Sequence, residues 1–189
     1  MASGDPEALM LRAQRGERRA FDDLVRVFHR GVYGYALRTL EDPDDAAEVT
    51  QETFVRAWRY RASFKPKAGA LRPWLFAIAA NRIRDARSQQ AKLRPLSDET
   101  LDRLQAGGEG GLEAYSRTVL REEVLAALEG LDPEQREVIV LKYLSGLTYG
   151  QIADVLEITP SAAKMRALRG REVLARQLAR LFESDAGAL

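Results

Sequence analysis

Apolar residues recur every three or four positions through most of this chain, which is the spacing of one buried face of an α-helix. No stretch alternates apolar and polar residues over the length of a strand with hairpin dipeptides between such stretches. The pattern therefore predicts an all-α protein. The predicted helices cover residues 21–40, 43–61, 73–88, 119–130, 133–144, 148–156 and 160–181.

Four of these helices begin at recognisable capping signals. Thr148 followed by Gln151 fits a capping box, in which the hydroxyl accepts an unpaired N–H while the amide reaches back. Thr159-Pro160, Asp42-Pro43 and Asp132-Pro133 each place a capping side chain before a proline, whose missing N–H costs nothing at the first helical position.

The last two helices are separated only by Glu157 and Ile158, so they must cross steeply, as in a helix-turn-helix. The segment from Lys164 to Arg180 contains six basic residues and a single acid, Glu172. A basic second helix in this unit favours a recognition helix on a phosphate backbone, although a solvated basic surface is the simpler explanation for one helix alone. The side expected to pack carries Ala163, Ala167, Gly170, Leu174, Leu178 and Leu181.

The acidic, glycine-rich stretch 94–116 divides the chain. Its composition predicts a flexible linker between two small helical domains, over residues 1–93 and 117–189. In the first domain, the helix that starts at Asp42-Pro43 is expected to turn one face inward. That inner face is predicted to carry Ala47, Thr50, Phe54 and Trp58.

Charge is distributed in blocks although the formal net charge is only +1. Residues 56–94 hold eleven Lys and Arg and one acid, whereas residues 95–135 hold three Arg and ten acids. Each block sets its own field, because screening limits a field to about 8–10 Å. The stretch 58–74 also interleaves four aromatic residues with its basic ones, which suits single-stranded nucleic acid, where a stacked base contributes about 1–3 kcal/mol. At least one of its two tryptophans is expected to belong to the core.

The residue types argue against catalysis. The chain has one histidine, no cysteine, no phosphate-binding loop and no Gly-x-Ser-x-Gly motif, so neither a nuclease nor a small hydrolase is favoured. Carboxylates at 44–52 are better explained as a solvated helix start than as a metal site, and no metal, cofactor or small-molecule substrate is expected. No apolar run approaches the roughly 20 residues that span a bilayer, and the N-terminus lacks a signal pattern, so we expect a cytoplasmic protein.

Three segments together give a resemblance. DAAEVTQETFVRAW resembles the polymerase-binding helix of region two in extracytoplasmic-function (ECF) sigma factors, and WLFAIAANRIRDARS resembles the promoter-reading helix that follows it. The segment from Leu131 to Leu174 resembles the helix-turn-helix of region four. The resemblance implies a bacterial sigma factor that binds core RNA polymerase, directs promoter recognition and DNA melting, and starts transcription without being an enzyme.

The resemblance also implies site residues. The predicted contacts to core polymerase are Glu48, Gln51, Glu52 and Phe54. The predicted contacts to the separated −10 strand are Arg59, Arg61, Phe64, Lys65, Lys67, Asn81, Arg84 and Arg87, with Arg82 facing inward and weaker. The predicted contacts to the −35 duplex are Thr148, Ser161, Lys164, Met165, Arg166, Leu168, Arg169 and Arg171, and Arg169 is best placed for a guanine edge.

A separate anti-sigma factor is a further implied partner, and it could hold the protein at the membrane. Several residues depart from the family pattern. Ala163 and Ala167 are small where larger aliphatic residues are usual, Glu157 stands where glycine is common, and Met165 replaces a small polar residue. Ala47 and Thr50 also deviate, where an acid and an aliphatic residue are common. The alternative function is a helix-turn-helix regulator with a helical ligand-binding or dimerisation domain.

Overall fold

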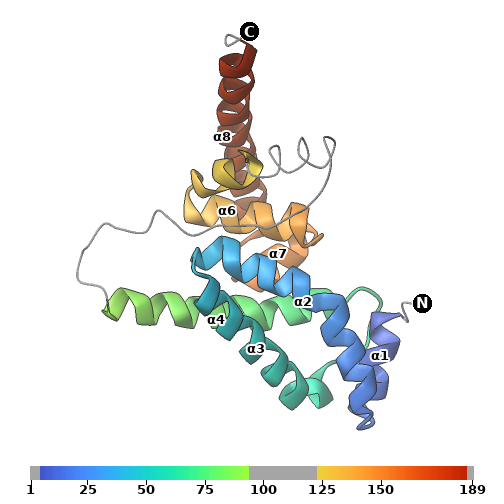
Figure 1. Ribbon diagram of the computed structural model, residues 1–189. Coiled ribbons are helices and arrows are strands. Elements are labelled where there is room, and N and C mark those ends of the chain that lie inside the picture. Colours follow the sequence, from blue (N-terminus) through green and yellow to red (C-terminus); the bar gives the residue numbers. More distant parts are fainter. Residues whose placement is uncertain (1–4, 94–122, 187–189) are drawn as a thin grey trace.

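A computed structural model describes residues 5–93 and 123–186, and every regular element in these ranges is helical (Figure 1). The first half of the chain forms α1 (Pro6–Gln14), α2 (Arg18–Leu40), α3 (Pro43–Tyr60), the 3-10 turn η1 (Arg61–Ser63) and α4 (Leu71–Leu93). The second half has helical residues 123–129, followed by α6 (Pro133–Ile139), the π-helical turn η2 (Val140–Leu144), α7 (Tyr149–Leu156) and α8 (Pro160–Ala186). The all-α fold predicted from the sequence is confirmed.

The predicted capping signals are all present. The Asp42 carboxylate accepts the backbone N–H groups of Asp44 and Asp45, both at 2.9 Å, and the Asp132 carboxylate caps α6 by accepting the N–H of Glu134 at 2.9 Å. Thr148 and Gln151 form the reciprocal capping box at the start of α7. The Thr159 hydroxyl accepts the N–H of Ala162 at 3.1 Å, and so starts α8. These helix starts follow from local chemistry, because each cap satisfies donors that the helix leaves unpaired.

Helix α1 was missed by the sequence analysis. Its start repeats the Asp-Pro signal, since the Asp5 carboxylate accepts the N–H of Glu7 and Pro6 is the first helical residue. The helix buries Leu9 and Met10. At its end, the Gln14 amide donates to the backbone oxygens of residues 61 and 64, both at 2.7 Å, so α1 fixes the turn that follows α3.

Large rings fill the core of the first half, where α2, α3 and α4 meet. Tyr35 and Phe76 are almost completely buried, and their ring centroids lie 5.7 Å apart. The predicted inner face of α3 is correct for Thr50 and Phe54. It is wrong for Ala47, which is exposed, whereas its neighbour Ala46 is fully buried. Two adjacent alanines give the sequence pattern no means of choosing between them.

Small residues bring α8 close to its neighbours in the second half. Ala163 and Ala167 are fully buried, as predicted. A Cβ atom added at Gly170 would lie 3.1 Å from Cγ1 of Ile139, so α8 approaches α6 more closely than a larger residue would allow. The opposite side of α8 carries the exposed residues Lys164, Met165, Leu168 and Arg169.

The two halves pack against each other. One continuous hydrophobic core includes Tyr35 and Phe76 from the first half together with Val138, Leu141 and Ile152 from the second. Figure 1 shows α6 and α7 beside α2, with α4 running beneath them. The predicted linker 94–116 lies outside the described residues, and the proposed domain boundaries stay a prediction.

Candidate polymerase and nucleic-acid interfaces

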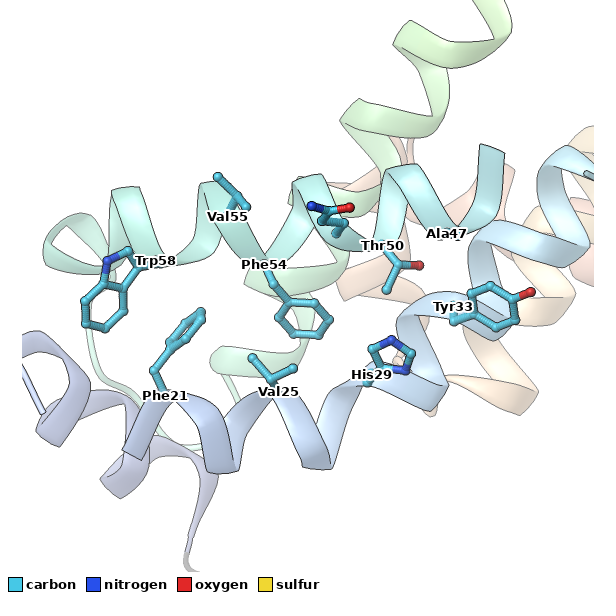
Figure 2. A pocket seen from close by; sticks show the side chains of 10 residues that line it. Phe21, Val25, His29, Tyr33, Ala47, Thr50, Phe54, Val55 and Trp58 are labelled. Atoms are coloured by element: carbon cyan, nitrogen blue, oxygen red, sulfur yellow. The ribbon is translucent and has the colours of Figure 1, made fainter. Parts of the chain in front are cut away.

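An apolar groove of about 640 Å³ lies between α2 and α3. Figure 2 shows Phe21, Val25, His29 and Tyr33 rising from α2 towards Thr50, Phe54 and Trp58 of α3. The His29 ring lies nearly parallel to the rings of Tyr33 and Phe54, with both centroid distances at 6.3 Å. The Phe21 ring meets Trp58 edge-on at 5.1 Å. The groove is therefore a preformed apolar surface with aromatic walls.

The predicted polymerase contacts lie along this groove and beside it. Gln51 and Phe54 line it, although Phe54 is largely buried. Glu48 is exposed, whereas the Glu52 carboxylate is engaged by Arg82 at 2.7 Å and by Arg56 at 3.5 Å. The inward placement expected for Arg82 is confirmed, and its partner on α3 is now identified.

The α2 side of the groove was missed by the sequence analysis. Phe21, Val25, His29 and Tyr33 follow one another at intervals of four residues. This row lies beside the core row of α2, so the apolar stripe is wider than packing against the bundle requires. The extra width of the apolar stripe on α2 is the sequence signal that could have revealed this side of the groove.

The end of α3 and the basic loop after it present some predicted contacts outward and turn others inward. Arg59, Lys65 and Lys67 are exposed, and so is the Tyr60 ring. The Phe64 ring is buried against Trp74, with centroids 5.3 Å apart, so it is not available to stack on a base in this conformation. Of the four aromatic residues in this stretch, Tyr60 has the freest face; both tryptophans are half-buried against the core.

Arg61 is also committed within the molecule. Its guanidinium lies 3.8 Å from the Trp58 ring centroid and donates to the backbone oxygens of Trp58 and Ala13, at 2.6 and 3.1 Å. These contacts join α1, α3 and the basic loop. We therefore assign Arg61 a positioning role for the loop in this conformation.

Helix α4 carries the remaining predicted −10 contacts. Asn81 is exposed. Arg84 forms an ion pair with Glu157 at 3.1 Å, and Arg87 lies 3.6 Å from the Glu137 carboxylate while donating to the backbone oxygen of Thr39 at 2.9 Å. Both glutamates belong to the second half of the chain. No pattern in the sequence indicates that these arginines would pair with carboxylates of the second half.

The helix-turn-helix consists of α7, the turn at 157–159 and α8. All eight predicted −35 contacts are outside the core, and seven are exposed: Thr148, Ser161, Lys164, Met165, Leu168, Arg169 and Arg171. Arg166 is partly covered because its guanidinium pairs with Glu134 at 2.7 Å. The buried alanines hold the opposite side of α8, so the basic face with Met165 and Leu168 between its cations projects outward.

Other kinds of site find no support within residues 5–93 and 123–186. No three His, Asp or Glu side chains come together there in a way that would hold a metal ion. No helix in the described part of the chain has the length and apolar character needed to cross a membrane.

Comparisons with known proteins agree with this arrangement. Residues 24–93 match the family model for sigma-70 region 2, and residues 121–174 match the model for sigma-70 region 4. RNA polymerase sigma-H factor of Pseudomonas aeruginosa is 30% identical over 180 residues, which cover 91% of this chain and 93% of that protein. ECF RNA polymerase sigma factor SigW of Bacillus subtilis is 34% identical over 179 residues, which cover 87% of this chain and 92% of that protein.

A solved structure is similar over both halves of the chain. CnrH, in complex with the cytosolic domain of CnrY, superposes with a TM-score of 0.67 at 28% identity, covering 93% of this chain and 98% of that one. Together with the two region matches and the full-length relatives, this shows that the chain belongs to the ECF RNA polymerase sigma factors, the non-enzymatic initiation factors that bind core polymerase and direct it to promoters.

Proposed function

We propose that the two halves divide promoter recognition between them, with the first half on separated strand and the second on duplex. The observation that carries this proposal is the contrast between their basic surfaces. The first half places exposed Arg59 and the exposed ring of Tyr60 at the end of α3, and exposed Lys65 and Lys67 in the irregular segment that follows. A loop of cations and an aromatic face suits unstacked bases, which stack on rings while phosphates meet the cations.

The second half instead presents one regular helix with a continuous basic face. An α-helix fits the major groove of intact duplex DNA, where arginine can bind the two acceptors of a guanine. Arg169 is exposed on that face. Met165 and Leu168 beside it are apolar and exposed, and they suit the methyl group of thymine.

The polymerase interface in this proposal is the α2–α3 groove and the acidic start of α3. Apolar anchors at the centre of an interface, with charged groups at its rim, are the usual arrangement of a stable contact. Phe54 supplies part of the apolar floor, Gln51 adds a polar amide to the lining, and exposed Glu48 supplies rim charge. A basic helical segment of core polymerase is the expected occupant, since its charge would complement α3.

An anti-sigma factor is the second proposed protein partner. The structure of CnrH is of its complex with the cytosolic domain of CnrY, and the structure of Bartonella quintana RpoE, which shares the fold at 24% identity and a TM-score of 0.61, is of its complex with the anti-sigma factor NepR. We expect a comparable partner to cover the groove and the basic face of α8. Purification of the full chain from its native cell should recover such a protein, and recovery of polymerase alone would contradict this part.

Run-off transcription with purified core polymerase on a randomised promoter library tests the proposed division. The chain should direct initiation at a defined pair of elements, and Arg169→Ala should lower initiation about 10- to 100-fold, the loss expected for one bidentate guanine contact. Arg176→Ala is the matched control, because Arg176 is also exposed on α8 but lies two turns further along. Equal effects of the two substitutions would contradict a base contact by Arg169.

Free protein in a gel shift provides a second check. Binding without core polymerase should be weak and should fall steeply with salt, because phosphate contacts would supply nearly all of it. Tight, sequence-specific binding by the free chain would contradict the proposal and favour a conventional helix-turn-helix regulator.

A further inference from the structure

The turn between α1 and α2 gathers cations that none of the predicted contacts includes. Gly16, at a φ angle of 94°, lets the chain reverse between the end of α1 at Gln14 and the start of α2 at Arg18. This tight reversal brings the two helix ends together. It exposes three arginines, which we call the turn arginines: Arg15, Arg18 and Arg19.

The turn arginines have no anionic partner of their own. None of them forms an ion pair, or a hydrogen bond through its side chain, with a residue in the ranges 5–93 and 123–186. Glu17 is the only acid in the turn, and Arg12 holds its carboxylate by an ion pair. The hydrogen bond from Arg12 lowers the pKa of Glu17, and the charge of Arg19 contributes less. By contrast, Arg26 and Arg84 each pair with a carboxylate. The turn therefore presents uncompensated positive charge to solvent.

Hydrogen bonds fix this turn beside the basic loop that follows α3. The Gln14 amide donates to two backbone oxygens of the loop, both at 2.7 Å. In return, the Arg61 guanidinium donates to the backbone oxygen of Ala13 at 3.1 Å. Because these bonds hold the end of α1 against the loop, the turn arginines continue the basic surface that exposed Lys65 and Lys67 begin.

Arg18 also lies on the side of α2 that faces α3. Phe21 and Val25 follow it at intervals of three and seven residues, so the three side chains share one side of the helix. Figure 2 shows Phe21 opposite Trp58, near the end of α3, and Val25 facing the same helix. Since Arg18 precedes Phe21 by one turn, it lies towards the end of α3, where the Tyr60 ring is exposed.

The chemistry of this surface suits a chain of phosphates. Successive cations beside an exposed ring can follow the backbone of a single strand, and an arginine guanidinium can donate two hydrogen bonds to one phosphate. A segment that binds a membrane surface would instead need large apolar side chains on one face. The stretch 12–19 has none: its one aliphatic residue, Ala13, is small and fully buried. A nucleic-acid strand is therefore the better fit.

We propose that the α1–α2 turn is a second contact for separated DNA strand, in which Arg15, Arg18 and Arg19 bind phosphates where the strand continues beyond the loop after α3. These contacts add affinity without sequence preference, because the phosphate is the same at every base. The inference rests on the proposed function, in which the first half holds separated strand.

Binding of the full-length chain to an oligothymidylate of about 16 nucleotides, followed by fluorescence anisotropy, tests the contact. Arg18→Gln/Arg19→Gln should weaken binding about tenfold at low salt. The slope of log affinity against log salt should become shallower by about 1.4, because each phosphate contact contributes about 0.7, and adding Arg15→Gln should bring the change to about 2. Arg26→Gln/Arg30→Gln is the matched control, because it removes two exposed arginines about 12 Å further along the same helix.

A charge-retaining variant separates a phosphate contact from a structural role. Arg15→Lys/Arg18→Lys/Arg19→Lys should keep the salt slope and most of the affinity, because lysine also binds phosphate as a point charge. All of these variants should keep the circular dichroism of the wild type, since the turn arginines are exposed and their side chains hold no other described residue in place.

Holoenzyme provides the readout on promoters. With core polymerase and the randomised promoter library, Arg18→Gln/Arg19→Gln should lower initiation by a similar factor at every promoter and leave the preferred sequence unchanged. A changed sequence preference would mean that these arginines contact bases, and it would overturn the phosphate contact.

The other outcomes are distinct. Equal losses in the double variant and its matched control would overturn the turn as a site, and so would a lysine variant as weak as the glutamine one. Unchanged strand binding with lost binding to phosphatidylglycerol vesicles would make the turn a membrane surface instead. A wild type that binds no strand and supports no run-off transcription would count against the proposed function itself.

Discussion

The two halves of the molecule pack their helices with side chains of very different size. The first fills the space between α2, α3 and α4 with rings such as Tyr35, Phe54 and Phe76, whereas the second brings α8 close to α6 and α7 through Ala163, Ala167 and Gly170. Large side chains hold helices apart and leave a groove on the bundle surface. Small side chains let the helices touch without a groove between them, and the opposite side of α8 is then held as a rigid face. The packing of each half thus suits the surface it offers.

Removal of one buried ring should destabilise the first half strongly. Phe76 is fully buried and packs on Tyr35. Phe76→Ala should lower the free energy of unfolding by about 3–5 kcal/mol, because both the transfer energy and a cavity contribute. Urea denaturation followed by circular dichroism measures this. Tyr60→Ala is the control, since that ring is half exposed and its loss should cost far less. A loss below 1 kcal/mol for Phe76→Ala would contradict this description of the core.

The second prediction tests whether α8 packs closely against α6 in the second half of the chain. Gly170→Leu should destabilise the protein by about 1–3 kcal/mol, because its Cβ alone would meet Ile139 at 3.1 Å. Gly150→Leu is the matched control on α7, where an added Cβ meets nothing within 4 Å. That substitution should be neutral or should stabilise by about 0.5–1 kcal/mol through helix propensity. Equal urea midpoints for the two variants would show that α8 is not held by close packing.

Sequence reasoning succeeded where structure is decided locally. The caps at Asp42, Asp132 and Thr148 were predictable because a side chain and an N–H two or three residues away settle them. Helix α1 was missed although Asp5-Pro6 repeats the same signal, since no long apolar pattern follows it. The outward basic face of α8 was predictable from the helical spacing of its buried residues.

Contacts between distant segments were not predictable. Tyr35 and Glu137 lie 102 positions apart, and no sequence pattern around either residue predicts their contact. The inward turn of Phe64 and Arg61 depends on α1, which the sequence pattern had not revealed. Residue type could suggest nucleic-acid contacts on this loop, but only tertiary packing decides which cations and rings remain free.

The groove beside the ring-filled core can be tested by a single charge placed on its edge. Val55 is half exposed beside the groove, so Val55→Asp should leave folding intact and weaken core polymerase binding about tenfold, or 1.4 kcal/mol. Val27→Asp is the control. Val27 is exposed to a similar degree on α2, but two residues from Val25 it points away from the groove. Competition for core polymerase against the wild-type chain provides the measurement. Identical competition by both variants would place the polymerase elsewhere.

The smallest effect concerns the boundary between the halves. Burial raises the pKa of Tyr35 well above 10, and the neighbouring Glu137 carboxylate raises it further. The neutral phenol therefore stabilises the native state fully below about pH 10, and this contribution declines at higher pH as the unfolded chain ionises. Tyr35→Phe should cost about 1 kcal/mol at pH 8 by removing the hydrogen bond to Glu137. The other tyrosines ionise in both proteins, so the difference in urea midpoint between wild type and variant isolates Tyr35. That difference should shrink between pH 10 and pH 11, and a constant difference would mean that Tyr35 reaches solvent and that the halves do not bury it.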